Sequence, residues 1–219
     1  MEWLELARQA LPVLIKGTGY TVFFALSTMV LGLLLGFVVA LVRIARVPLL
    51  APLLAFYVSV MRGTPLLVQI FVIYYGLPSV GIEFEPVTAG VLSLTLNVAA
   101  YLSESLRGAI AGVERGQWDA AQSLGLNWWQ AMRHVIAPQA LRLAVPSLAN
   151  SLISLIKDTS LVSVITVSEL MMATKDVIAQ TFQPLPLYLM AAGIYWMMSA
   201  LFEQVQKRLE LRLAQAYHR

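Results

Sequence analysis

The sequence predicts an all-α integral membrane protein with about five transmembrane helices. Of its 219 residues, 59% are hydrophobic and only 12% are charged, and the mean hydropathy is +0.75. A soluble domain usually carries about a quarter charged residues, so a chain this poor in charge cannot cover a water-facing surface. A helix that crosses the hydrocarbon core needs about 20 mostly apolar residues, and separated apolar runs of this length recur along the chain.

The expected spans are interrupted by polar residues at two places. They cover approximately residues 20–42, 49–75, 87–110, 143–167 and 185–205. The first contains no charged residue, residues 62–65 interrupt the second, and the fourth contains Lys157 and Asp158. The start of the chain contains Glu2 and Glu5 and lacks the basic region of a signal peptide, so the first run is expected to remain as a helix.

Basic residues gather in alternate connecting segments. One set comprises the segment after the first span, the segment between the third and fourth spans, and the C-terminal tail; it contains Arg43, Arg46, Arg107, Arg115, Arg133, Arg142, Lys207, Arg208, Arg212 and Arg219. The opposite set contains Arg8, Lys16 and Lys175. Because Lys and Arg accumulate in cytoplasmic loops, this separation supports five spans, with the N-terminus outside and the C-terminus in the cytoplasm.

The segment between the third and fourth spans, about residues 113–138, is long and amphipathic. We expect two short helices, the first ending near Gly125. Asn127 is expected to cap the second, with Gln130 completing a capping box, and Pro138 to stop it. A structured loop of this length is usually functional. The alternative is a helix pair lying on lipid, anchored by Trp118, Trp128 and Trp129.

Several motifs of catalysis and nucleotide binding are absent from the sequence. It has no Gly-x-x-x-x-Gly-Lys-Ser/Thr, and therefore no P-loop for ATP phosphates. It also lacks His-Glu-x-x-His and Gly-x-Ser-x-Gly, and its two histidines, His134 and His218, lie far apart. Without cysteines it has neither disulfides nor a Cys-ligated metal site. We therefore expect no enzyme and no cofactor in this chain.

Polar residues follow one face of the third span. Asn97, Tyr101 and Glu104 are spaced by four and three residues, which places them on the same side of a helix. Such a stripe lines a cavity or forms an interhelical hydrogen-bond seam, and the spacing fits both. Gly32 and Gly36 in the first span match the small-residue pattern of closely packed membrane helices, and packing within the chain is favoured over a dimer contact.

Lys157 and Asp158 are charges inside an apolar run. A charge at the bilayer centre costs roughly 2.5–3.5 kcal/mol, so these side chains are expected to face the bundle interior or a cavity. Neighbouring helical residues point about 100° apart, so the two need not pair with each other. They suit a zwitterionic amino acid, with its carboxylate at Lys157 and its ammonium at Asp158. The alternative is a structural ion-pair network with Glu104 and Arg107.

The spacing Asp119-Ala120-Ala121, then Gly125, then Ile136-x-Pro138 resembles the cytoplasmic signature loop of bacterial ABC importer permeases. That loop reads Glu-Ala-Ala, three residues, Gly and later Ile-x-Leu-Pro, so Asp119 and Ala137 are mild departures. Further segments resemble the polar amino-acid branch of this family: Lys16-Gly17-Thr18-Gly19-Tyr20-Thr21, Arg62-Gly63-Thr64-Pro65-Leu66, Tyr74-Tyr75-Gly76-Leu77-Pro78, Asn97-x-x-Ala100-Tyr101-x-x-Glu104-x-x-Arg107 and Lys157-Asp158-Thr159-Ser160-Leu161.

The resemblance implies a single permease domain over residues 1–219, with the type I fold of ABC importers and a coupling helix in the loop. It implies ATPase contacts at Asp119, Ala120, Ala121 and Gly125. It also implies a solute site on the third and fourth spans, made of Asn97, Tyr101, Glu104, Lys157, Asp158, Thr159 and Leu161.

The resemblance also implies partners and a location. A dimer of ATPase subunits would bind the ATP and Mg that this chain does not, and a second permease copy or a paralogue would complete the pathway. An extracytoplasmic binding protein would deliver a polar amino acid across the inner membrane, and the first half of the chain favours cystine or a similar solute. The alternative is a proton-coupled secondary transporter or channel that uses Lys157, Asp158 and Glu104 as a relay.

Overall fold

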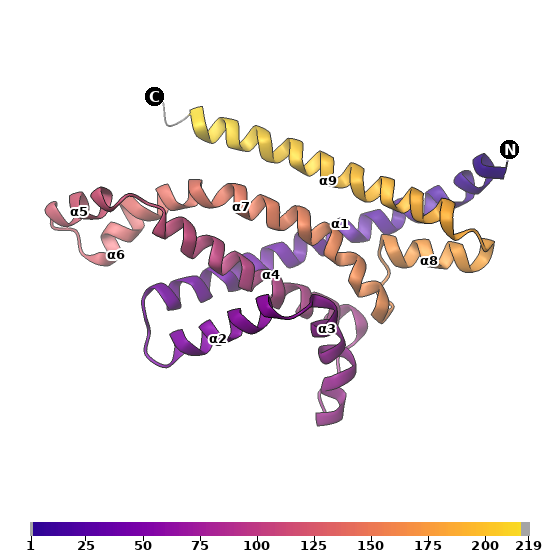
Figure 1. The fold of residues 1–219 in the computed structure, drawn as a ribbon, viewed down its shortest axis with the longest axis horizontal. Coiled ribbons are helices and arrows are strands. Elements are labelled where there is room, and N and C mark those ends of the chain that lie inside the picture. The colour runs from indigo at the N-terminus through magenta and orange to yellow at the C-terminus, as the bar shows by residue number, and fades with distance from the viewer. Residues whose placement is uncertain (1, 216–219) are drawn as a thin grey trace.

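The computed structural model describes residues 2–215, and the side chains of residues 3–211. Every regular element in this part of the chain is helical (Figure 1). The α-helices are α1 (Glu2–Ile44), α2 (Leu50–Gly63), α3 (Leu66–Phe71), α4 (Pro86–Ala111), α5 (Arg115–Ser123), α6 (Trp128–Ala131), α7 (Ala137–Asp158), α8 (Leu170–Thr181) and α9 (Pro184–Gln215). Two π-helical segments, η1 (Val72–Gly76) and η3 (Met132–Ile136), and two 3₁₀ segments, η2 (Leu77–Val80) and η4 (Thr159–Ile165), join or extend them.

The structure agrees with the prediction of about five spans when one bent pair of helices is counted as a span. Four stretches within the described residues, Trp3–Ile44, Pro86–Ala111, Trp128–Ile165 and Pro184–Leu211, are long and apolar enough to cross a membrane. The fifth is the pair Leu50–Gly63 and Leu66–Val80, which is bent by 110°. The first helix is much longer than predicted, because it continues without a break from Glu2 through Pro12 and Lys16.

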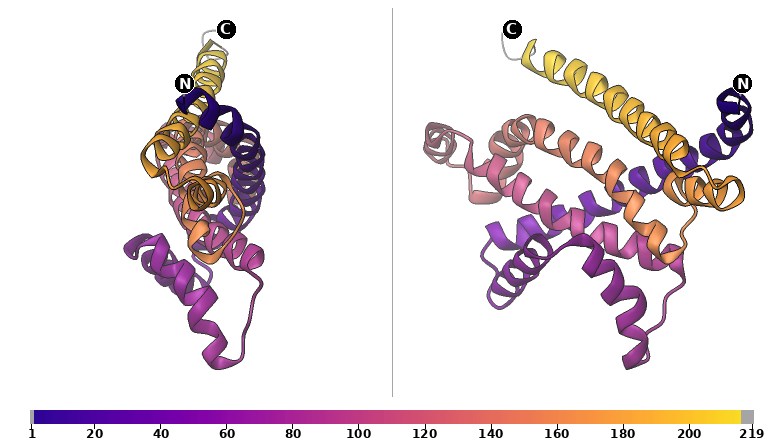
Figure 2. Two further views of the ribbon diagram at one scale, coloured as in Figure 1. Left: turned by 90° about the vertical axis from the view of Figure 1, so that its right-hand side faces the viewer. Right: turned by 45° about the vertical axis from the view of Figure 1, so that its right-hand side comes forward.

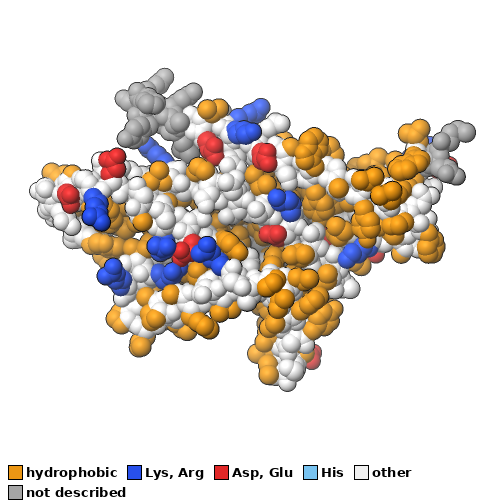
Figure 3. All heavy atoms as spheres, viewed as in Figure 1, with side chains coloured by type: hydrophobic (Ala, Val, Ile, Leu, Met, Phe, Trp, Pro, Cys, Tyr) orange, Lys and Arg blue, Asp and Glu red, His pale blue; other side chains and the backbone are white. Residues whose placement is uncertain are grey.

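The bundle is organised around α1 and α4. α1 packs along α4, and α4 packs on α7. α8 packs mainly on α1, and α9 packs mainly on α7 (Figure 1). The main apolar core lies where α1, α3, α4 and the end of α7 meet, around Phe24, Ile70, Leu94 and Leu102. Hydrophobic side chains cover much of the surface in Figure 3, as expected of a protein surrounded by lipid.

The second span is broken at Thr64 and Pro65, as the sequence predicts. Thr64 is extended and Pro65 precedes α3, so the chain turns away from the bundle there (Figure 2). The break leaves carbonyl groups without helical partners, which costs free energy in a membrane unless other groups bond to them. Buried Gln69 supplies such bonds, because its amide nitrogen donates to the Met61 carbonyl at 2.9 Å and the Thr64 carbonyl at 3.2 Å.

The long loop contains the two expected short helices, but the second of them continues into the next span. Gly125 has φ +73°, a left-handed conformation that suits glycine, just beyond the end of α5. Asn127 and Gln130 form the predicted capping box, with bonds of 3.0 and 2.9 Å between side chains and backbone. The prediction that Pro138 stops the helix is wrong. α6 runs through η3 into α7, because a wide π turn, in which the Ala137 N–H bonds to Met132, brings Pro138 into the first turn of α7, where its missing N–H is tolerated.

Two glycines on α1 allow its close approach to α4. A Cβ added at Gly36 would lie 2.8 Å from the Ala99 carbonyl oxygen and 3.1 Å from the Leu102 Cβ, and Gly32 faces Val98. The small-residue pattern therefore packs helices within the chain, as the sequence favours. Since the obstacle at Gly36 is backbone, a larger side chain there cannot be relieved by a rotamer change.

We expect Gly36→Ala to destabilise the bundle by about 1–3 kcal/mol, the usual range for overpacking. Gly19→Ala, on the same helix with no atom within 4 Å of the added Cβ, is the matched control. It should keep or slightly raise the stability, because alanine is the better helix former. Thermal unfolding in detergent measures both, and equal melting temperatures would contradict the close contact.

Candidate functional site

A cavity of about 570 Å³ opens between α4, α7 and the break in the second span. Most of the side chains that line it are small and polar. They come from the break (Thr64, Pro65, Leu66), from α4 (Asn97, Val98, Tyr101, Ser105) and from α7 (Ser147, Asn150, Ser151, Ser154, Leu155, Asp158). A polar cavity among spanning helices is a feature of solute pathways, because polar groups that face lipid are costly.

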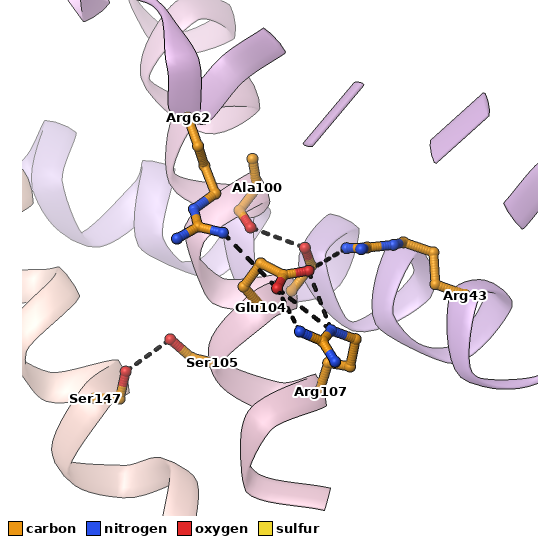
Figure 4. Close-up of polar contacts among 8 residues, drawn as sticks. Arg43, Arg62, Ala100, Glu104, Ser105, Arg107 and Ser147 are labelled. Atoms are coloured by element: carbon orange, nitrogen blue, oxygen red, sulfur yellow. Dashed lines mark hydrogen bonds and ion pairs between the residues drawn. The ribbon is translucent and has the colours of Figure 1, made fainter. Parts of the chain in front are cut away.

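Helical spacing explains how two spans build the wall. On α4, Asn97, Tyr101 and Ser105 recur every four residues, and on α7 the polar positions recur every three or four. At one point the walls touch, since the hydroxyls of Ser105 and Ser147 lie 2.7 Å apart (Figure 4). The small side chains leave open space where larger ones would close the gap between the helices.

Three of the seven residues implied as a solute site line this cavity: Asn97, Tyr101 and Asp158. Asn97 also takes part in an interhelical seam, because its amide donates to Gln69 Oε1 at 2.9 Å and to the Met61 carbonyl at 3.2 Å. The stripe on α4 thus lines the cavity on one side and braces the broken span on the other. Gln69 was not identified from the sequence, where it is one polar residue within an apolar run.

The other four residues lie elsewhere. The Lys157 side chain is exposed and does not line the cavity, so the structure does not bring Lys157 and Asp158 together there. Thr159 is buried and donates to the Ile156 carbonyl at 2.7 Å, and Leu161 packs against the main core. Asp158 ends α7, and the chain continues as η4, so neighbouring residues at this point face different surroundings.

Glu104 lies in a cluster of arginines contributed by three helices (Figure 4). Arg43 at the end of α1 pairs with Oε1, and Arg107 on α4 donates to Oε2 at 2.8 Å. Arg62 on α2 approaches Oε2 at 3.7 Å. The expected structural ion pair of Glu104 and Arg107 is therefore present, but Lys157 and Asp158 take no part in it, and Arg43 and Arg62 complete the cluster instead.

The signature residues of the loop differ in their exposure to solvent. Asp119, Ala120 and Gly125 are exposed, and Gly125 lies at the turn between α5 and α6. Ala121 is 1% exposed, because α5 packs on α6 and η3 with this side facing inward. In this arrangement Ala121 packs within the loop, and the surface open to another protein is formed by its neighbours.

The sequence did not identify a buried carboxylate that joins α8 to α1 and α9. Glu169 is fully buried and caps α8 by accepting from the Met172 N–H at 2.8 Å. It also accepts from the Tyr195 hydroxyl at 2.6 Å and from Thr21 at 3.4 Å. The acid before an apolar helical run was the available signal. Among the described residues, no group of three His, Cys, Asp or Glu side chains is placed to hold a metal ion.

Comparison with known proteins identifies the family. The family described as "Binding-protein-dependent transport system inner membrane component" matches residues 32–215. The chain belongs to this family. It is therefore a multi-pass inner-membrane component of a transport system, with the type I fold expected of ABC importers, and not an enzyme.

Individual relatives agree with this membership along nearly the whole chain. The probable amino-acid ABC transporter permease protein YckA of Bacillus subtilis (strain 168) is 43% identical over 96% of this chain and 93% of its own length. The L-cystine transport system permease protein TcyB of the same organism is 40% identical over 92% of this chain and 87% of its own. A chain from "Crystal structure of an amino acid ABC transporter with histidines" superposes with a TM-score of 0.92 at 33% identity, covering 97% of this permease and 99% of that chain.

We expect Glu104→Gln to destabilise this permease by about 1–2 kcal/mol, because its removal leaves like charges together, while solvent at the exposed arginines reduces the cost below that of a buried network. Three arginines would then face one another without a carboxylate. Glu83→Gln, on an exposed loop residue, is the control and should melt like the parent. Adding Arg107→Gln to Glu104→Gln should restore part of the loss in thermal unfolding. A Glu104→Gln permease with the parental melting temperature would show that the cluster contributes no stability.

Proposed function

We propose that this permease is the membrane-spanning subunit of an ATP-driven importer of a polar amino acid, with cystine or a similar solute favoured. The observation that carries the proposal is the polar cavity between α4 and α7, which combines Asn97, Tyr101 and Asp158 within a membrane-spanning bundle. Its volume of about 570 Å³ suits a solute of amino-acid size. The relatives named for amino-acid and L-cystine transport support the solute class.

The proposed assembly contains two permease subunits, which are identical or paralogous, and two ATPase subunits that bind ATP and Mg. An extracytoplasmic binding protein delivers the solute. The exposed face of α5, with Asp119, Ala120 and the turn at Gly125, is the proposed ATPase contact. Closure of the ATPases on ATP moves this coupling helix and alternates access to the cavity.

The proposed orientation has the loop and the C-terminus in the cytoplasm and the N-terminus outside. Many of the Lys and Arg side chains visible in Figure 3 gather toward the end of the bundle that carries α5 and α6. Arg43, Arg46 and Arg115 belong to this end. This distribution supports the orientation, because basic residues are enriched on the cytoplasmic side.

A proton relay through Lys157, Asp158 and Glu104 is less well supported. Glu104 is engaged by arginines, and the Lys157 side chain lies outside the cavity that Asp158 lines. A relay needs titrating groups in a continuous chain, and these three do not form one. The exposed coupling loop would also have no task in a transporter driven by protons alone.

The test is ATP-dependent uptake of L-cystine and other polar amino acids into proteoliposomes containing the permease, its ATPase and its binding protein. We expect Ala120→Arg to abolish uptake, since a long charged side chain would block the docking face. Ala179→Arg, the same change at an exposed position of α8, should leave uptake intact. The free energy of unfolding of both variants should lie within about 0.5 kcal/mol of the parental value, as is usual for surface substitutions. Parental uptake by Ala120→Arg would contradict the coupling role, and parental protein that transports no amino acid would contradict the solute class.

A further inference from the structure

The arginine cluster carries more positive charge than its carboxylate neutralises. Arg43, Arg62 and Arg107 surround Glu104, and no other carboxylate within the described side chains lies within ion-pair distance of them. Arg43 and Arg107 donate hydrogen bonds to Glu104, and Arg107 does so through two nitrogens. The carboxylate is thus already shared between these two, and the cluster retains unneutralised positive charge.

Arg62 is the least engaged of the three. Its Nη1 lies 3.7 Å from Glu104 Oε2, which is beyond hydrogen-bond distance, and residues 3–211 offer its side chain no hydrogen-bond acceptor. Its side chain is 44% exposed. A guanidinium has five N–H donors, so most of the donors of Arg62 remain open for an added acceptor.

Arg62 is not one of the residues that line the cavity, but it lies against one of them. Its guanidinium carbon lies 5.4 Å from the ring centre of Tyr101, and Tyr101 lines the cavity. Thr64 and Pro65, which follow Arg62 closely in sequence, line the cavity as well. Figure 4 shows the side chain reaching from α2 toward α4.

A carboxylate of the cavity wall lies on α7. Asp158 lines the cavity and has no ion-pair partner within the part of the chain that is described. An anion without an ion-pair partner thus lines the cavity on α7, and a cation with open donors lies on α2 against Tyr101 of the cavity wall. A zwitterionic amino acid carries the complementary pair, whereas a simple amine or a simple carboxylic acid complements only one of them.

We propose that Arg62 is the carboxylate-binding residue of this cavity, with Asp158 taking the ammonium group, in place of the Lys157 role that the sequence suggested. This inference rests on the proposed function and adds a specificity-determining residue to it. Arg62 binds the carboxylate of the solute in the bidentate manner that its planar guanidinium favours. Glu104, held by Arg43 and Arg107, keeps the Arg62 side chain extended beside Tyr101 and acts as a positioning residue.

The test compares amino acids with their decarboxylated amines. Binding to the detergent-solubilised permease–ATPase complex is measured for L-cystine and cystamine, L-histidine and histamine, and L-arginine and agmatine. The parental complex should prefer one amino acid over its amine. Arg62→Gln should weaken binding of that amino acid by about 10- to 100-fold, the effect of losing a charged hydrogen bond, and should leave the amine unchanged. Arg62→Lys, which keeps the charge and loses the planar fork, should retain part of the preference.

The controls separate this role from a structural one. Arg208→Gln, the same change at an exposed position of α9, should leave the preference intact. If Arg62→Gln weakens amino acid and amine equally, Arg62 only supports the fold, and the proposal is overturned. Loss of the preference in Lys157→Gln instead would assign the carboxylate to Lys157. If the complex imports an amino acid into proteoliposomes but Arg62→Gln binds it normally, the proposed function stands and this inference falls.

Discussion

Polar groups on membrane-spanning helices must find partners inside the protein, and this constraint determines how the bundle is put together. Glu104 is the clearest case, because its carboxylate joins arginines from α1, α2 and α4. Buried Gln69 serves the same purpose at the broken span, where it bonds to Met61 and Thr64. Each polar residue that is satisfied in this way fixes one helix against another, since the alternative is an unpaired group in hydrocarbon.

The cavity follows from the same constraint combined with side-chain size. Where α1 meets α4, glycines let the helices pack tightly. Where α4 meets α7, serines and asparagines occupy the facing positions and leave a polar space between the helices. Asp158 lines that space without an ion-pair partner among the described side chains, and Arg62 lies beside it, against Tyr101. Tight packing on one side of α4 and open space on the other give a rigid wall beside a pathway.

Local patterns carried most of what the sequence could predict. The apolar runs, the capping box at Asn127 and the turn at Gly125 depend on neighbouring residues, and the structure agrees with them. The sequence did not predict that the helix continues through Pro138. The π turn before it shifts the helical register, and no single residue indicates such a turn. The separation of Lys157 from Asp158 was also missed, since the rotation of the end of α7 relative to α4 depends on tertiary packing.

On the proposed function, the polar side chains of α7 line a water-filled pathway rather than a dry helix seam. The chain contains no cysteine, so single-cysteine variants report one position each. The deciding measurement is the labelling of Ser151→Cys, in the cavity wall, by a charged methanethiosulfonate in proteoliposomes, with Ser93→Cys at a buried position of α4 as control. We expect Ser151→Cys to be labelled, the transported amino acid to slow this labelling, and Ser93→Cys to stay unlabelled. An unlabelled Ser151→Cys would show that this face of α7 is a dry helix seam and not a pathway.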